Sequence, residues 1–304
     1  MTFDINLYFS GSVGEKVYEY MIERDVCRLC TYAYPKEAPE YLNLCNRVGK
    51  RCNMMMDSGA FTAWSIGKPV QLDALIAYNQ DILKTYGSHH DFVFISLDVI
   101  PGERGQRATS EQIASAVRQS YDNFRIMQQH FPHHKVMPVY HSGEDVSLRD
   151  AYLQMTDYVC LSMDQGFTET NRLEWAKRSI VPGFFFHGLA ATGNKMVTQI
   201  DWYSVDSSSW LTVGSMGSLL WPTSRGTFRT LPVSTNSPAR QAAGQHVDTL
   251  TASDRQAVVN ALQARGFNLE QLQTDYDYRH KWNIEMWCDP PWTPALVKPM
   301  DLFS

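Results

Sequence analysis

The sequence predicts an α/β protein, a (β/α)8 TIM barrel with a C-terminal extension. Eight apolar, strand-like runs follow one another over the first two thirds of the chain, with amphipathic segments between them. Most of these runs are almost continuously apolar, which is typical of parallel strands covered on both faces. Nearly every run ends in a polar residue able to do chemistry, as expected where barrel strands reach their active-site rim.

The expected strands are short and regularly spaced. An open, doubly wound sheet is the competing arrangement, and it usually carries a glycine-rich phosphate loop after its first strand. The run Gly11-Ser12-Val13-Gly14 has too few glycines for that loop. We expect the strands at residues 5–10, 28–33, 52–58, 92–99, 136–141, 158–163, 183–189 and 202–207.

Apolar residues at helical spacing predict helices between several strands, most clearly around residues 72–86, 113–127 and 148–155. The barrel is expected to span residues 1–225. The extension, residues 226–304, should begin with a loop or linker and continue as a plain helical hairpin, rather than a helix-turn-helix, around Gly266. The proline-rich tail from Trp282 onward is expected to pack irregularly.

Composition excludes several classes of protein. Among 304 residues, 44% are hydrophobic and 19% charged, which is enough apolar surface for a large core and excludes a disordered chain. The net charge of −5 does not suit a protein that coats nucleic acid non-specifically, so contact with nucleic acid would need a local patch. The sequence has no apolar run of membrane-spanning length and does not begin like a secretory signal, which predicts a cytoplasmic protein without membrane contact.

The cysteines are expected to be free thiols. In a cytoplasmic chain of this size a disulfide framework is not expected. Cys27, Cys30, Cys45 and Cys52 could form a zinc set, but their spacing is loose and the first two lie in a strand-like run. We therefore predict no bound metal and keep this zinc set as the alternative.

Carboxylates and histidines recur at the ends of the predicted strands. A single aspartate at a strand end often caps the next helix, but several at matching ends of one barrel indicate a shared site. Such a set suits a reaction with one carboxylate as nucleophile and another as general acid and base. A metal-dependent hydrolase would be the weaker alternative, because the sequence has no His-x-His pair after its first strand. The strand-end residues are Asp57, Asp98, His141, Asp164, His187 and Asp206.

The order of these motifs resembles the guanine transglycosylase superfamily. Residues 57–61, Asp-Ser-Gly-Ala-Phe, are similar to the Asp-Ser-Gly-Gly-Phe/Tyr motif of that family, and residues 96–98, Ser-Leu-Asp, to its Ser-Phe-Asp segment. Residues 139–143 and 158–166 stand where the family has its Val-Gln-Gly-Gly and Gly-Gly-Leu segments. Asp206 follows an Ile-Asp pair as the family's nucleophile does, and the resemblance covers about residues 50–210.

The resemblance implies a role for each matching residue. Asp206 would be the nucleophile on C1′ of the target nucleoside, Asp57 the general acid and base, and Asp98 the acceptor for the guanine edge. The resemblance implies base-edge contacts for Ser58 and His141. It implies lining of the base pocket for Ser162 and Met163, and stacking on the base for Phe61. His187, at its own strand end, is a further substrate-binding candidate.

One departure from the family selects a branch of it. The tRNA-modifying members carry a C-terminal set of zinc-binding cysteines, whereas Cys288 is the only cysteine here after Cys160. This favours the DNA-acting branch of phages and bacteria, which exchanges guanine in DNA for a 7-deazaguanine derivative. The expected partners are DNA and the free base, without a cofactor, in the host cytoplasm if the chain is phage-encoded. Arg225 and Arg229 are candidate phosphate contacts, with ordinary surface arginines as the alternative.

Three other functions stay open at this point. A tRNA-guanine transglycosylase would use the same chemistry on another polymer. A retaining glycoside hydrolase would use a similar carboxylate pair. A barrel that only binds a nucleotide would need no nucleophile. The sequence predicts neither the base that is inserted, nor the target sequence, nor the oligomeric state.

Overall fold

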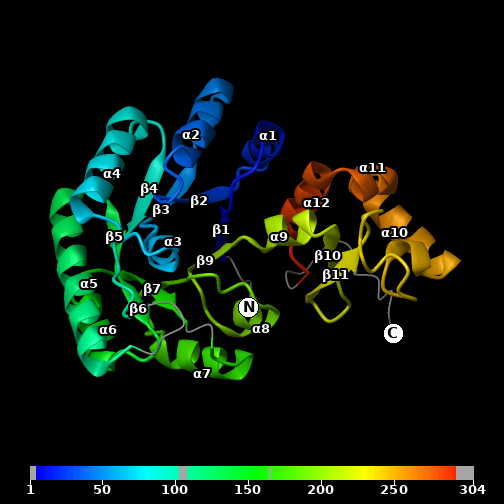
Figure 1. Cartoon of the computed structure of the whole chain (residues 1–304). Coiled ribbons are helices and arrows are strands. Elements are labelled where there is room, and N and C mark those ends of the chain that lie inside the picture. The colour runs from blue at the N-terminus through cyan, green and yellow to red at the C-terminus, as the bar shows by residue number, and fades with distance from the viewer. Residues whose placement is uncertain (1–4, 103–107, 164–165, 292–304) are drawn as a thin grey trace. The chain divides into compact units, whose positions relative to one another are not determined.

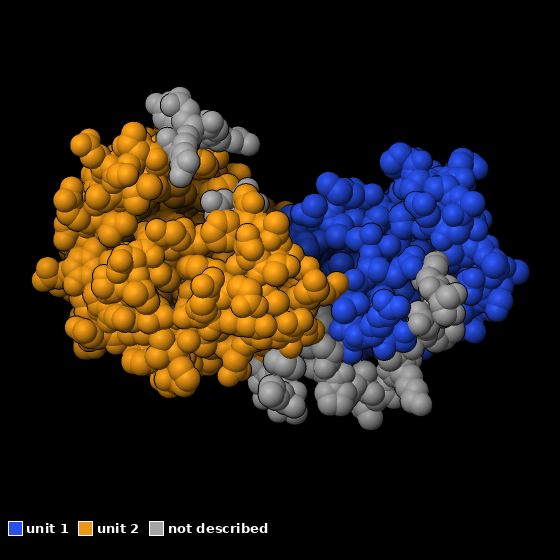
Figure 2. Space-filling model, turned by 90° about the horizontal axis from the view of Figure 1, so that it is seen from below, with its two compact units in different colours: residues 1–3, 13–24, 207–304 blue, residues 4–12, 25–206 orange. Residues whose placement is uncertain are grey.

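The computed structural model describes residues 5–102, 108–163 and 166–291 of the chain (Figure 1). They form two compact units, coloured separately in Figure 2. The barrel unit comprises residues 4–12 and 25–206, and the C-terminal unit comprises residues 1–3, 13–24 and 207–304. The division after Asp206 comes earlier than the expected one after residue 225, because the segment that follows the last barrel strand packs with the C-terminal helices.

The barrel unit is built on one parallel sheet, whose strand order is β5-β4-β3-β2-β1-β9-β8-β7-β6. β5 and β6 are the two halves of one expected strand, so the order returns to its start and describes a (β/α)8 barrel. All eight expected strands are confirmed, with ends shifted by a few residues. The strands are β1 (Asn6–Ser10), β2 (Cys27–Thr31), β3 (Asn53–Asp57), β4 (Asp91–Ile95), β5 (Lys135–Met137), β6 (Val139–His141), β7 (Tyr158–Ser162), β8 (Phe185–Gly188) and β9 (Ser204–Ser207).

The barrel closes through the strand that Pro138 interrupts. The Met137 carbonyl accepts a hydrogen bond from the Ser96 amide at 2.8 Å, on the β4 side. The next carbonyl, that of Pro138, accepts from the Cys160 amide at 2.9 Å, on the β7 side. Proline has no amide hydrogen to donate to a ladder, and the strand exchanges one neighbour for the other at this residue.

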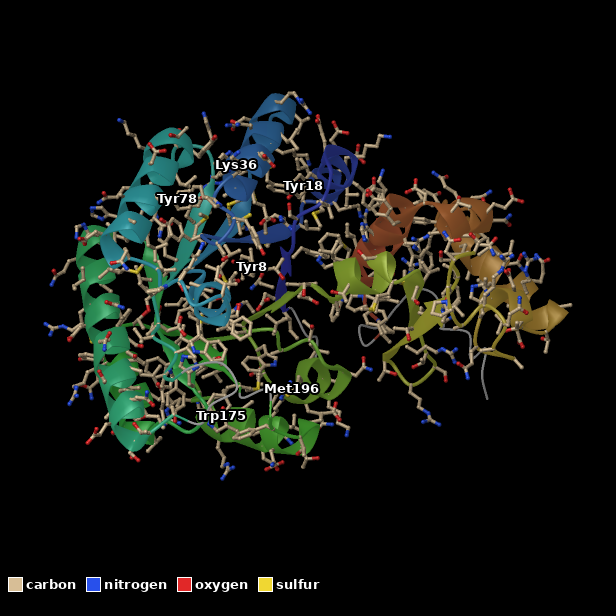
Figure 3. The ribbon with its side chains drawn as sticks, in the orientation of Figure 1. Tyr8, Tyr18, Lys36, Tyr78, Trp175 and Met196 are labelled. Carbon is tan, nitrogen blue, oxygen red and sulfur yellow. The ribbon has the colours of Figure 1, made fainter. Side chains whose placement is uncertain are left out.

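Side chains from successive strands fill the interior of the barrel. Tyr8, labelled in Figure 3, belongs to a buried cluster to which β1 through β7 contribute. A packed interior of this kind leaves the strand ends, and not the middle of the barrel, for chemistry. The cluster consists of Tyr8, Leu29, Met55, Ile95, Met137, Val139, Tyr158 and Cys160.

Helices follow the strands and lie outside the sheet (Figure 1). The three helices predicted between strands are confirmed. The long α5 begins with a capping box, in which the Thr109 hydroxyl accepts from the Gln112 amide and the Gln112 side chain accepts from the Thr109 amide. The helices of this unit are α2 (Glu37–Val48), α3 (Ala60–Ser65), α4 (Leu72–Tyr86), α5 (Ser110–His130), α6 (Val146–Leu153), α7 (Glu169–Ser179) and α8 (Asn194–Gln199).

The C-terminal unit combines helices with one antiparallel hairpin. The hairpin, β10 with β11, includes the first residues of the expected linker. Two helices flank Gly266, where a helical hairpin was expected: Thr251 caps the first, α10, and Asn268 caps the second, α11. The elements are α1 (Glu15–Glu23), α9 (Ser209–Ser215), β10 (Ser218–Pro222), β11 (Phe228–Pro232), η1 (Val247–Thr249), α10 (Ala252–Ala264), α11 (Leu269–Thr274) and α12 (Tyr276–Cys288).

The expectation of an irregular tail from Trp282 is wrong as far as residue 288. Residues 276–288 form α12, which Asp275 caps by accepting from the amides of Asp277 and Tyr278. α12 packs against α1, α9 and β10, so most of its circumference is buried and no simple apolar stripe marks it. The rest of that tail, residues 292–304, lies outside the described residues. No helix in the described part of the chain is long and apolar enough to cross a membrane.

Candidate active site

The carboxyl ends of the barrel strands bring the three predicted aspartates together. Asp57 is the last residue of β3, Asp98 lies three residues after β4, and Asp206 is in β9. The charges of Asp98 and Asp206 both act on the pKa of Asp57, and all three carboxylates act on the pKa of the Cys160 thiol. The sequence prediction that these strand ends share one site therefore agrees with the geometry. Asp164, another strand-end residue, lies outside the described residues.

Asp57 is half-buried, and its surroundings change its pKa. Burial raises its pKa to about 6, and the nearby charges of Asp98 and Asp206 act in the same direction. Hydrogen bonds from the Thr31 hydroxyl and from the Gly59 amide, at 3.0 Å, oppose this rise. Gly59 has a φ of 74°, and a Cβ there would come within 2.8 Å of the Ala33 amide nitrogen, so the turn that supplies this amide needs glycine.

Asp98 is paired with a histidine. The Nε2 atom of His141, in β6, lies 3.0 Å from Asp98 Oδ2. Burial acts to lower the pKa of His141, but the hydrogen bond and charge of Asp98, with the charge of Glu144, outweigh it, and the pKa is raised. The Glu144 carboxylate accepts from the His141 amide at 2.7 Å, and burial raises the pKa of Glu144. The expected contacts of Asp98 and His141 with a base edge must therefore use polar atoms other than Asp98 Oδ2 and His141 Nε2, which are in contact with each other.

Asp206 accepts a backbone hydrogen bond and faces a histidine. Its Oδ1 atom accepts a hydrogen bond from the Ala190 amide at 2.7 Å and lies 3.4 Å from His187 Nε2. Ala190 has a φ of 49°, the left-handed conformation that a residue with a side chain rarely adopts. Strained backbone of this kind concentrates at functional sites, where the surrounding structure holds it. Both contacts fall on the same oxygen of Asp206.

His187 does not reach solvent. Its side chain is completely buried, and Nδ1 lies 2.6 Å from the Ser204 hydroxyl. The Ser204 hydroxyl is in turn 2.5 Å from the Tyr158 hydroxyl. The structure thus places His187 against Asp206, away from any surface that substrate reaches directly, which differs from the expected substrate contact.

The remaining substrate candidates differ in exposure. Ser58 is buried, and its hydroxyl accepts from the Ala60 amide at 3.4 Å. Phe61, on α3, is 55% exposed beside Trp64, as a residue that stacks on a base would be. Ser162 and Met163 are half-buried at the end of β7. Ser58 and Phe61 follow β3, and Ser162 and Met163 lie at the end of β7, so all four are found at carboxyl ends of barrel strands.

The two candidate phosphate contacts belong to the other unit. Arg225 is exposed in the turn between β10 and β11, and Arg229 is half-buried in β11. The hairpin is part of the C-terminal unit, whereas the aspartates belong to the barrel unit. Their role as DNA contacts stays a prediction.

The cysteines of the alternative zinc set are free thiols. Cys30, Cys45 and Cys52 are buried and Cys27 is half-buried. A hydrogen bond with Cys52 lowers the pKa of Cys45 and raises that of Cys52. Within residues 5–102, 108–163 and 166–291, no three His, Cys, Asp or Glu side chains are grouped so that they could hold a metal ion.

Sequence reasoning did not single out five residues that contact this site. Thr31 lies near the end of the predicted strand 28–33, which precedes that of Asp57, and Glu144 comes three residues after His141, so both positions carried a signal that could have been used. Ala190 could not be found, because its role depends on a backbone conformation. Ser204 and Tyr158 lie inside predicted strands and look like ordinary core positions.

Comparisons with known proteins add little to this description. The sequence matches no protein-family model and no curated protein. Among solved structures, the chain is similar to D-psicose 3-epimerase from Clostridium cellulolyticum H10, crystallised with D-tagatose, at 9% identity. The match covers 66% of this chain and 80% of the epimerase, with a TM-score of 0.34. A likeness this distant says nothing about activity, and the strand order described above identifies the barrel.

Proposed function

We propose that the chain is a glycosyltransferase, a DNA-guanine transglycosylase that exchanges guanine in DNA for a 7-deazaguanine derivative. The observation that carries the proposal is the contrast between two carboxyl groups at one barrel mouth. Asp206 is anchored by an amide and faces a histidine, as suits an ionised nucleophile. Asp57, with a pKa of about 6, is suited to take up and release a proton near neutral pH.

The first half of the exchange forms a covalent intermediate. A carboxylate oxygen of Asp206 attacks C1′ of the target nucleotide, and the bond from C1′ to N9 of guanine breaks. The electron pair of that bond stays on the departing guanine, which takes the proton of the Asp57 carboxyl. The product of this step is an ester between Asp206 and C1′, with Asp57 ionised.

The second half returns the enzyme to its starting state. The incoming base gives the proton on N9 to the Asp57 carboxylate, and N9 then attacks C1′. The ester bond breaks, and its electron pair returns to Asp206. Two displacements at the same carbon retain its configuration, as in retaining glycosidases.

Asp98 supports selection of guanine-like bases. A carboxylate at this depth accepts hydrogen bonds from the N1–H and amino groups that guanine and 7-deazaguanines share. Adenine presents an acceptor at N1 and would leave the carboxylate without a partner, which is costly in a buried site. The contact of Asp98 Oδ2 with His141 Nε2, at 3.0 Å, would fix the orientation of the carboxylate for this recognition.

The choice of DNA rests on the sequence. The zinc-binding cysteines of the tRNA-modifying relatives have no counterpart after Cys160 except Cys288. The target base must leave the helix to reach the strand ends, which costs less in single-stranded than in double-stranded DNA. The same mechanism acting on tRNA is the remaining alternative.

The test is to incubate the protein with radiolabelled guanine and either DNA or tRNA, and to measure which polymer acquires label. In parallel, a denaturing gel detects the covalent adduct. We expect label and adduct with DNA, and neither with Asp206→Asn. Asp201→Asn is the matched control, because Asp201 is an exposed aspartate five residues away.

Three results would change the conclusion. Label in tRNA alone would move the activity to the tRNA branch. An adduct that survives in Asp206→Asn would move the nucleophile elsewhere, with Asp57 the next candidate. Absence of label and adduct with both polymers would remove the transglycosylase assignment.

A further inference from the structure

A line of three buried side chains leads to Asp206 from inside the barrel. The Tyr158 hydroxyl lies 2.5 Å from the Ser204 hydroxyl, which lies 2.6 Å from His187 Nδ1. On the other side of the imidazole ring, Nε2 lies 3.4 Å from Asp206 Oδ1. His187 and Ser204 are completely buried and Tyr158 is 4% exposed. The residues come from β7, β8 and β9, three neighbouring strands of the sheet.

The position of each proton in this line of hydrogen bonds follows from Asp206, which is the last acceptor. Ionised Asp206 only accepts, so a hydrogen bond with His187 requires the proton on Nε2. Nδ1 of a neutral imidazole is then an acceptor, and the Ser204 hydroxyl must donate to it. Ser204 has one hydrogen, so its oxygen accepts from Tyr158. Each hydroxyl donates once, and the line runs in one direction from Tyr158 to Asp206.

A charged imidazole would break this arrangement. With protons on both ring nitrogens, Nδ1 would donate to Ser204, and the Ser204 hydrogen would have to turn towards Tyr158. The hydrogen of Tyr158 would then lose this acceptor. The ring also meets the Tyr8 side chain edge-on, with centroids 6.1 Å apart.

The His187 Nε2 position has no hydrogen bond of good geometry among the described residues, and the carboxylate at 3.4 Å is the acceptor it faces. A buried donor without a partner destabilises the fold, so a small approach of the two groups would be favourable. Hydrogen bonds at catalytic groups are often long in the free enzyme and shorten when substrate binds.

We propose that His187 is a positioning residue for Asp206, held in its Nε2–H form by Ser204 and Tyr158. His187 and the Ala190 amide both hold Oδ1, so the carboxylate is fixed with its other oxygen directed to the reacting carbon. The imidazole also stabilises the anion that forms each time the ester breaks. This inference depends on the proposed function only in naming Asp206 as the nucleophile, and the hydrogen-bond line itself does not depend on the reaction.

The test separates the proton arrangement from the reaction. Nitrogen-15 NMR of histidine-labelled protein reports which ring nitrogen of His187 carries the proton. We expect the neutral Nε2–H form near pH 7, and loss of this single form in Ser204→Ala. A wild-type spectrum with the proton on Nδ1, or a doubly protonated ring, would overturn the proposal whatever the reaction is.

The kinetic part compares variants of the line with a control outside it. The variants are His187→Leu, Ser204→Ala and Tyr158→Phe. The control is Ser179→Ala, because Ser179 is a buried serine of the same unit whose hydroxyl donates to the Trp175 carbonyl at 2.9 Å. The measured quantities are the single-turnover rate of adduct formation, the KM for DNA and the melting temperature.

We expect His187→Leu to lower the rate of adduct formation about 10- to 100-fold, the effect known for partners that orient metal-binding side chains. The KM for DNA should not change, and the loss should become smaller in the order His187, Ser204, Tyr158. A His187→Leu variant that is only less stable, with the rate of the Ser179→Ala control, would overturn the positioning role. Failure of the wild type to form any adduct, with the expected NMR form present, would instead contradict the proposed function.

Discussion

The barrel mouth and α12 both bury polar side chains, but they use them differently. On α12, Asn283 accepts from the Leu220 amide at 2.7 Å and donates to the Trp210 carbonyl at 3.0 Å, and Arg279 donates to two further carbonyls. At the barrel mouth, the half-buried Asp57 lies near two other carboxylates, and Asp98 is paired with a histidine. One group of polar residues joins segments of backbone, whereas the other places side chains near one another.

This difference separates stability from activity. A side chain that satisfies backbone groups stabilises the fold, and its loss leaves buried donors and acceptors unpaired. Carboxyl groups kept close together and away from water destabilise the fold, and they persist where a reaction needs them. Substitutions in the two regions should therefore have opposite effects, and the predictions below test this contrast.

The largest effect is expected for Asp57→Asn on turnover. The asparagine keeps the size of the side chain but cannot take up or release the proton that each half of the exchange moves. Turnover should fall about 10²- to 10⁴-fold, the usual contribution of general acid–base catalysis. Steady-state label exchange measures this, with the exposed Asp73→Asn as control. Unchanged turnover in Asp57→Asn would assign the proton transfer to another group.

The next effect concerns stability, on the other side of the comparison. Asn283→Ala leaves the Leu220 amide and the Trp210 carbonyl without their buried partner, so the free energy of unfolding should fall by about 2–4 kcal/mol. Turnover per folded molecule should stay at the wild-type value. Urea unfolding followed by circular dichroism, with label exchange on the folded protein, checks both parts. A loss of turnover without a loss of stability would contradict the division between the two regions.

The raised pKa of Asp57 should appear in the pH dependence of stability. Its pKa in the folded state is about 6, against an ordinary value of 3.8, so the folded protein holds this proton more tightly than the unfolded chain. The resulting stabilisation is fully present below pH 3.8 and is lost as the pH rises through about 6. Its loss should cost on the order of 3 kcal/mol at neutral pH.

The comparison with Asp57→Asn isolates this effect from other titrating groups. Relative to wild type, the variant should gain up to that amount of unfolding free energy between pH 4 and pH 7. Unfolding measured at several pH values in both proteins gives the difference directly. A difference that stays constant with pH would show that Asp57 titrates at its ordinary value.

The smallest effect is expected for Arg225→Gln. If this exposed hairpin arginine contacts a phosphate, DNA binding should weaken at all sequences, and the slope of log K against log salt should decrease by about 1. Turnover at saturating DNA should not change. The control is Arg255→Gln, which removes an exposed arginine from α10 of the same unit. Equal slopes for wild type and Arg225→Gln would leave Arg225 as an ordinary surface residue.

Most of the barrel could be predicted because its strands are short apolar runs that end in polar residues. Met54, Met55 and Met56 are all buried and stand directly before Asp57, so this pattern predicts both the strand and the carboxyl group at its end. A parallel strand covered on both faces has no polar face, and this is why its signal is so clear. The assembly of the aspartates then follows from the barrel itself.

The features that could not be predicted depend on contacts between segments that are distant in the sequence. α12 mixes buried tryptophans with buried polar residues, because α1, α9, α11 and β10 all pack against it. Its sequence therefore has no apolar period that would predict a helix. The pairing of Asp98 with His141 and the left-handed backbone of Ala190 arise from tertiary structure. The burial of His187 against Asp206 arises in the same way, and a strand-end position alone did not distinguish it from a substrate contact.

The way the chain passes between the two units has a consequence during synthesis on the ribosome. α1 is made among the first residues, yet its buried face of Val17, Tyr18, Met21 and Ile22 packs in the unit completed by α12, more than 250 residues later. The ring of strands can form as soon as Asp206 has emerged, whereas α1 must wait with apolar side chains uncovered. At about 5–20 residues per second this delay lasts on the order of 10–50 seconds. Nascent chains stalled after Asp206 has emerged but before α12 is complete should therefore be the form of this protein that chaperones bind most strongly.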